Sequence, residues 1–109
     1  MDRKTLDELR AELEAMRGVP QRPGDVANFA ERLGRNRMRG RRGEPTWVSD
    51  FDIPNLSIPI HSGDLKKGTQ KSILIQLEDD FLAWEEKLES DERYKEHLKI
   101  ERKKRGLEE

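Results

Sequence analysis

The stretch from Thr69 to Leu88, TQKSILIQLEDDFLAWEEKL, carries the strongest periodicity of the chain. Apolar side chains recur in it at helical spacing, at Ile73, Leu77, Phe81, Trp84 and Leu88, and the stripe is widened by Leu74 and Leu82. Residues at these intervals share one face of an α-helix, and so regular an apolar face is buried in a folded protein. The stretch therefore predicts a long helix, capped by Thr69, on which the rest of the fold packs.

Two short segments with a different period precede this helix. Trp47, Ser49 and Phe51 alternate with Thr46, Val48 and Asp50, and Leu56, Ile58 and Ile60 alternate with Ser57 and Pro59, with Pro54 and Asn55 between the two segments. Alternation on either side of turn residues predicts two strands of an antiparallel hairpin. Pro59 has no N–H to donate to a neighbouring strand, so the second strand is expected to lie at an edge of the sheet.

Two shorter helices are expected further upstream. Thr5–Arg17 places one apolar stripe on a helical face, and Asp25–Leu33 has a second apolar face that ends at Gly34. The stripe of the first helix consists of Leu6, Leu9, Leu13 and Met16. So thin a stripe needs a partner to be stable, which is either the chain's own domain or another chain.

The composition limits the domain organisation. Of 109 residues, 32% are hydrophobic and 41% charged, which allows one small domain with extensions. We expect a helix and linker at 1–24, an α+β domain at 25–90, and a charged helical extension or tail at 91–109, with Ser90 and Asp91 as a candidate break. No apolar run is long enough to span a membrane, so the expectation is a soluble cytoplasmic protein without a membrane partner.

The composition also limits the chemistry. The chain has no cysteine and two histidines, which excludes thiolate metal sites and cysteine nucleophiles. We therefore expect no metal ion and no cofactor.

The net charge of -1 conceals a basic centre. Arg32–Lys71 holds 9 basic and 4 acidic residues. Its arginines are Arg32, Arg35, Arg37, Arg39, Arg41 and Arg42, and its lysines are Lys66, Lys67 and Lys71. Residues two apart on a strand share one face, so Arg35, Arg37, Arg39 and Arg41 predict a charged face outside the core. Guanidinium groups bind phosphate oxygens well, and these residues, with Arg42 and the three lysines near the helix start, predict a nucleic-acid-binding surface.

Two alternatives remain for these residues. The arginines could form a solvated face that pairs with the acidic part of the long helix, within the chain or from a second copy. That acidic part contains Glu78, Asp79, Asp80, Glu85, Glu86 and Glu89. Trp47 could stack on a base, although a tryptophan in a hairpin is more often part of the core.

The phrase IPIHSGDLKKGTQKSILIQL, Ile58–Leu77, resembles the HicA (YcfA-like) family of bacterial toxin-antitoxin systems. In that family a strand with a proline and histidine phrase leads through a lysine-rich turn to Gly-Thr and a helix, as Pro59, His61 and the residues from Lys66 to Thr69 do here. The resemblance covers roughly Asp25–Leu88. It implies a small double-stranded-RNA-binding-like fold, with helices on one face of a three-stranded antiparallel sheet. It also implies an mRNA interferase held in check by a HicB-like antitoxin.

The chain departs from the family at the catalytic position. Where the family has glycine, serine and histidine, this chain has Gly43, Glu44 and Pro45. Proline cannot accept a proton, so the usual nuclease chemistry loses its base. Glu44 and His61 remain as candidate catalytic residues, although a lone histidine at a strand end is more often a surface residue.

Three functions follow from these observations. The first is an RNA-binding module that lacks the usual catalytic histidine, and this is the interpretation we favour. The second is a divergent mRNA interferase toxin that uses Glu44 or His61. The third is a protein-interaction or oligomerisation domain, in which the N-terminal stripe and the acidic helix join partner chains through apolar stripes and opposed charges.

Overall fold

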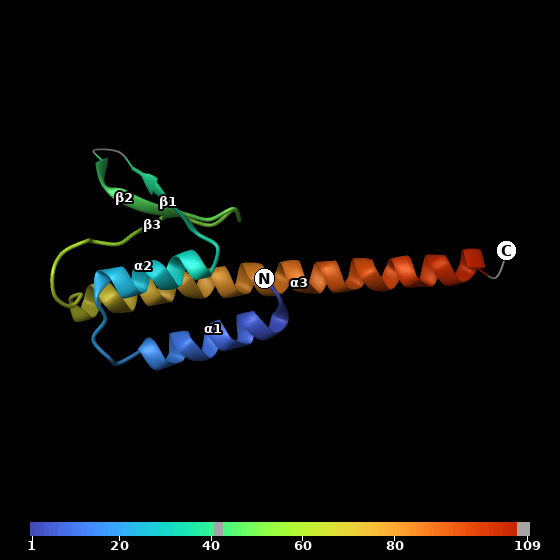
Figure 1. Ribbon diagram of the computed structural model, residues 1–109, viewed down its shortest axis with the longest axis horizontal. Coiled ribbons are helices and arrows are strands. Elements are labelled where there is room, and N and C mark those ends of the chain that lie inside the picture. The colour runs from blue at the N-terminus through green and yellow to red at the C-terminus, as the bar shows by residue number, and fades with distance from the viewer. Residues whose placement is uncertain (41–42, 107–109) are drawn as a thin grey trace.

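The computed structural model describes residues 1–40 and 43–106, with side chains to Glu101. Within these ranges the chain is an α+β protein with three helices and a three-stranded antiparallel sheet. The helices are α1 (Arg3–Met16), α2 (Pro23–Arg32) and α3 (Lys67–Gly106), and the strands are β1 (Asn36–Arg39), β2 (Pro45–Val48) and β3 (Leu56–Ser57). The sheet lies on one side of α2 and α3, and α1 lies along the side of α3 that faces away from the sheet (Figure 1).

The first half of α3 forms the centre of the core. Ile73, Leu74, Leu77 and Phe81 are buried, with Trp84 and Leu88 packed against them, as the periodicity predicts. Leu82 does not widen this stripe. It lies about 100° further around the helix axis than Phe81, so its side chain points away from the core and is 64% exposed. No helix in the described part of the chain is both long and apolar enough to cross a membrane.

The second half of α3 leaves the body of the protein. The helix continues through Ser90 and Asp91 without a break and reaches Gly106. Every side chain from Ser90 to Glu101 is exposed, and this part of the helix projects alone from the domain (Figure 1). The last part of the extension or tail expected at 91–109, residues 107–109, lies outside the described residues.

The N-terminal helix packs on its own domain. Leu6, Leu9, Leu13 and Met16 are all buried in the common core, on the side of α1 that contacts α3. Asp2 caps the helix by accepting a hydrogen bond from the Thr5 backbone N–H at 2.7 Å. The interpretation that this stripe joins another chain is therefore wrong, since α3 of the same chain already covers it.

The sheet has the order β1-β2-β3, with both pairs antiparallel. Arg37 faces Trp47 across the first pair, and Trp47 faces Leu56 across the second. Trp47 and Leu56 are fully buried, which identifies this face as the one packed on the helices. The predicted hairpin is thus present with shorter strands, and β3 is an edge strand, as Pro59 predicts.

Candidate nucleic-acid interface

Arg35 is not part of an exposed face. It follows α2, is only 4% exposed, and donates from Nε and Nη2 to the two carboxylate oxygens of Asp80 at 2.8 and 2.7 Å. Its Nη1 donates to the backbone oxygens of Trp47 and Pro54, each at 3.1 Å. The prediction that Arg35 contacts a polyanion is therefore wrong. The alternative, a solvated face that pairs with the acidic part of the long helix, is confirmed for Arg35 in its pairing within the chain but not in its solvation, because Arg35 is buried.

Arg37 and Arg39 are exposed on β1. Arg37 lies on the same side of the sheet as Trp47, and its guanidinium carbon is 5.4 Å from the centre of that ring, within the range of a cation–π contact. The prediction that the arginines lie outside the core is therefore confirmed for Arg37 and Arg39, but it is wrong about the side of the sheet, because they lie on the side that carries Trp47. The two arginines stay exposed because β1 is an edge strand. Trp47 is a core residue and is not available to stack on a base.

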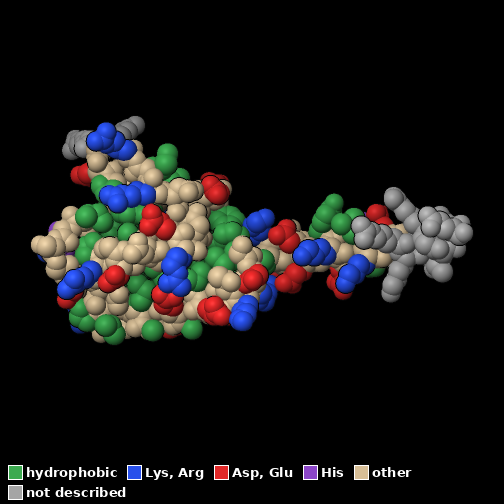
Figure 2. All heavy atoms as spheres, in the orientation of Figure 1, with side chains coloured by type: hydrophobic (Ala, Val, Ile, Leu, Met, Phe, Trp, Pro, Cys, Tyr) green, Lys and Arg blue, Asp and Glu red, His purple; other side chains and the backbone are tan. Residues whose placement is uncertain are grey.

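The β1–β2 turn continues the basic strand. Arg41 and Arg42, predicted here as binding residues, lie outside the described residues. The turn is closed by a hydrogen bond of 2.7 Å from the Gly40 N–H to the Glu44 carbonyl oxygen. A Cβ atom at Gly40 would lie 2.7 Å from the Thr46 hydroxyl oxygen and 2.9 Å from the Glu44 backbone oxygen, so this close approach of the backbone requires glycine. Figure 2 shows Lys and Arg side chains next to this turn.

The three predicted lysines lie at the N-terminus of α3. Lys66, Lys67 and Lys71 are exposed, and the last two line a cavity of about 510 Å³. This cavity lies between α3 and the linker that joins α1 to α2, and its apolar lining includes Leu65, Leu74 and Ile75.

A buried glutamine fixes the linker beside these lysines. Gln70 donates to the backbone oxygens of Met16 and Val19 at 3.3 and 2.8 Å, and its side-chain oxygen accepts from the Gln21 N–H at 2.9 Å. The apolar periodicity assigns Gln70 no role, although this residue falls on the buried side of the helix close to Ile73 and Leu74. A polar residue in the apolar stripe was the signal that could have identified it.

A second cavity, of about 710 Å³, separates the two basic groups. The hairpin contributes Glu44 and Pro45, β3 and the residues after it contribute Ser57–Ile60, and α3 contributes Thr69 and Ser72. His61 is exposed beyond the cavity lining, and its Nδ1 lies 2.9 Å from the Ser62 carbonyl oxygen. The structure therefore places only one of the two candidate catalytic residues, Glu44, at a cavity.

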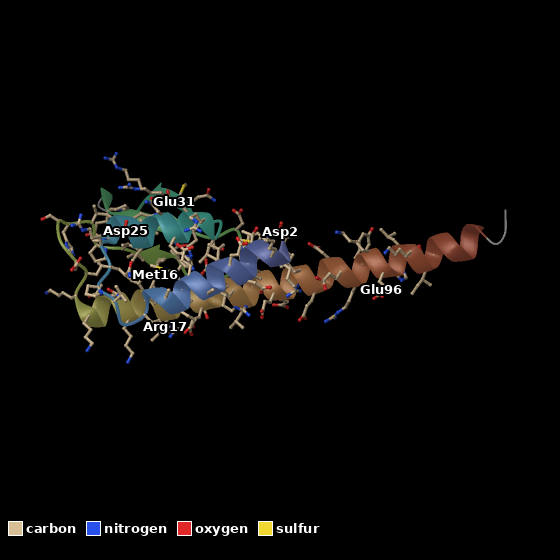
Figure 3. The ribbon with its side chains drawn as sticks, turned by 60° about the horizontal axis from the view of Figure 1, so that its bottom comes forward. Asp2, Met16, Arg17, Asp25, Glu31 and Glu96 are labelled. Carbon is tan, nitrogen blue, oxygen red and sulfur yellow. The ribbon has the colours of Figure 1, made fainter. Side chains whose placement is uncertain are left out.

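Three acidic residues of α3 pair with arginines of α1. Arg10 pairs with Glu85, Arg17 pairs with Glu78, and Arg3 pairs with Glu92 at 3.2 Å. Figure 3 shows α1 lying along α3, with Asp2 near one end and Arg17 near the other. Within the described residues, no ion pair involves Arg37, Arg39 or the three lysines. None of these five side chains is therefore neutralised within the described chain, and Arg22 at the start of α2 is likewise exposed and forms none of these ion pairs.

Comparisons with protein-family models, with curated proteins and with solved structures find no match to this chain. Among the described residues no group of three or more histidine, aspartate or glutamate side chains is arranged to hold a metal ion.

Proposed function

We propose that this chain is an RNA-binding module of HicA-like, double-stranded-RNA-binding-like fold, without the usual catalytic histidine. Three helices on one side of a three-stranded antiparallel sheet are compatible with that fold. Pro45 lies at the position where the resembling family has its catalytic histidine. The module binds rather than cleaves, because Pro45 supplies no base.

The observation that carries this proposal is the pair of exposed arginines on β1. Arg37 and Arg39 are held on an edge strand, have no ion-pair partner among the described residues, and lead into a turn whose sequence adds two more arginines. A planar guanidinium donates to two phosphate oxygens at once, and exposed arginines pay little desolvation cost before they bind.

The two basic groups suit a duplex better than a single strand. Arg37 and Arg39 lie on the hairpin, and Lys66, Lys67 and Lys71 lie across the first turns of α3. An RNA duplex offers phosphates on both sides of a groove, and proteins of this kind contact it by shape and backbone rather than by base sequence. We therefore expect binding to double-stranded RNA with little sequence preference.

The test is fluorescence anisotropy of a labelled RNA duplex titrated with the protein at 50 and 200 mM salt. Each phosphate contact contributes about 0.9 to the slope of log affinity against log salt for a duplex. The variant Arg37→Ala/Arg39→Ala should lower that slope by roughly 2 and weaken binding at both salt concentrations. The variant Lys66→Ala/Lys67→Ala/Lys71→Ala should act in the same direction.

The matched control is Lys4→Ala/Lys95→Ala. It removes two positive charges from exposed side chains on α1 and on the projecting part of α3. It should bind RNA like the wild type if the contacts are local. Equal loss in the control and in Arg37→Ala/Arg39→Ala would reduce the effect to net charge, and no binding at 50 mM salt would end the proposal.

A second candidate function is an mRNA interferase with Glu44 as its base, opposed by a HicB-like antitoxin. It is favoured by one observation, that Glu44 lines the cavity of about 710 Å³, to which α3 contributes Thr69 and Ser72. The measurement is cleavage of a labelled transcript by the wild type, by Glu44→Gln and by His61→Ala. Cleavage that is lost in Glu44→Gln and kept in His61→Ala would support this candidate, and an intact transcript with all three proteins would exclude it.

A further inference from the structure

Three apolar side chains, widely spaced along one face of α3, are exposed to solvent. Ile75, Leu82 and Ile100 are 48%, 64% and 53% exposed. An α-helix turns by about 100° per residue, which places these three side chains within about 20° of one another around the helix axis. They share a single line that runs from the domain onto the projecting half, where no other element of the described chain lies (Figure 1).

The charge of α3 changes sign along the same helix. Residues 78–92 contain 8 acidic side chains and 1 basic one, whereas residues 93–105 contain 7 basic and 2 acidic ones. A second copy in the antiparallel direction would place each acidic half against a basic half. A parallel copy would place like charges together, which is unfavourable.

The ion pairs between α1 and α3 lie on a different side of α3 from this apolar line. Arg17 and Arg10 pair with Glu78 and Glu85, which lie on the side of α3 that faces α1. Asp79 and Glu86 are exposed, and no ion pair involves either of them among the described residues. Both lie within about 60° of Leu82 around the axis, so they border the apolar line.

We propose that two copies of this chain associate through α3 in antiparallel orientation, centred near Asp91. This register brings Leu82 of one chain opposite Ile100 of the other, at two symmetric places. It also brings Glu89 opposite Arg93, which now form only a loose pair within one helix at 3.6 Å. A two-fold interface of this kind is self-complementary and closed, and it gives the projecting helix a packing partner.

Charge reversal tests the complementarity. The acid-reversed variant is Asp79→Lys/Glu89→Lys, and the base-reversed variant is Arg93→Glu/Lys99→Glu. At 50 mM salt and 100 µM protein, sedimentation should give the wild type a mass twice its 12.8 kDa. Each variant alone should be monomeric, and their equimolar mixture should recover the dimer, because opposite charges then meet at both ends of the pair.

Disulfide trapping tests the orientation. The chain contains no cysteine, so introduced thiols react only with one another. A mixture of Leu82→Cys and Ile100→Cys should form a cross-linked dimer under mild oxidation, at least tenfold faster than Leu82→Cys alone. Faster cross-linking of Leu82→Cys with itself would indicate a parallel pair and overturn the register.

Other outcomes overturn the proposal as a whole. A wild type that stays monomeric at 100 µM and 50 mM salt would leave the face to solvent or to a different protein. A mixture of the reversed variants that stays monomeric would show that charge does not select the partner. Far-UV circular dichroism of each variant establishes that the fold is intact, and all substituted side chains are exposed.

Discussion

Arg35 and Asp80 form an ion pair that is buried between the start of the sheet and α3. Both side chains are 2% exposed, and four hydrogen bonds satisfy three nitrogens of the guanidinium group. Burial raises the pKa of the Asp80 carboxyl group, and the hydrogen bonds and charge of Arg35 oppose that rise. A buried pair of this kind is costly to break, because the remaining partner is left charged or unsatisfied in the core.

The first prediction follows from this pair. Arg35→Ala should lower the free energy of unfolding by about 3 to 5 kcal/mol, measured by urea denaturation. Arg39→Ala, four residues along the chain and exposed, should change it by less than about 0.5 kcal/mol. The double variant Arg35→Met/Asp80→Leu should recover most of the loss, because it removes both charges and keeps apolar volume. Similar losses in Arg35→Ala and Arg39→Ala would show that the pair does not hold the fold together.

The second prediction concerns Asp2, which caps α1. The hydrogen bonds from Thr5 lower the pKa of the Asp2 carboxyl group in the folded state. The carboxylate therefore stabilises the fold above the unfolded pKa of about 3.9, and this contribution is lost as the pH falls through the lower folded pKa.

The measurement is thermal unfolding, followed by circular dichroism at pH 6 and pH 2.5. Asp2→Ala should be less stable than the wild type at pH 6, and the difference should shrink at pH 2.5. Asp2→Asn caps the helix without a charge, so its advantage over Asp2→Ala should persist at both values. A difference between wild type and Asp2→Ala that is constant with pH would contradict the role of the carboxylate.

At the scale of elements, α1 is stabilised by its contact with α3. Leu9 is 2% exposed in the common core, and Leu9→Ala should lower the free energy of unfolding by about 2 to 5 kcal/mol. Leu82→Ala makes the same chemical change at a side chain that is 64% exposed, and it should cost less than about 0.5 kcal/mol at protein concentrations that keep the chain monomeric. Denaturation curves of the two variants provide the comparison. An equal effect of both substitutions would mean that α1 does not depend on this packing.

The helices and the hairpin are the part of the fold that could be predicted from the sequence. Helical and alternating periods predict all three helices and the hairpin, because burial imposes those periods on apolar residues. Gly34 ends α2 with a φ of +101°, as its position predicts. The role of Arg35 was not predictable in this way, since a period assigns a residue to a face but does not name its partner. Asp80 is 45 residues away along the chain.

The candidate site was predictable to a lesser degree. The exposure of Arg37, Arg39 and the three lysines agrees with their assignment to a surface, and their binding to RNA stays a prediction. The sequence does not predict that a cavity of about 710 Å³ separates the arginines from the lysines, because that depends on how the hairpin packs against the first turns of α3. The role of Gln70 is not predictable from the sequence either. Its side chain donates to backbone oxygens of Met16 and Val19 and so fixes the linker between α1 and α2.

At the scale of the whole molecule, the chain is far more extended than its length requires. Its radius of gyration is 18.4 Å and its longest dimension is 66 Å, whereas a compact domain of about 100 residues has a radius of gyration near 13 Å. The projecting half of α3 accounts for the difference (Figure 1). Glu96 on this half points into solvent, far from the sheet (Figure 3). A single helix without packing is only marginally stable in water.

Hydrogen exchange measures this difference directly. In dilute protein at 500 mM salt, backbone amides of residues 92–101 should exchange roughly 100-fold or more faster than those of residues 73–88, because local opening there breaks no core contact. At 100 µM protein and 50 mM salt, the amides of residues 92–101 should become protected as antiparallel copies associate. The Arg93→Glu/Lys99→Glu variant should show no such gain. Fast exchange of residues 92–101 under both conditions would mean that the projecting helix has no partner in a second copy.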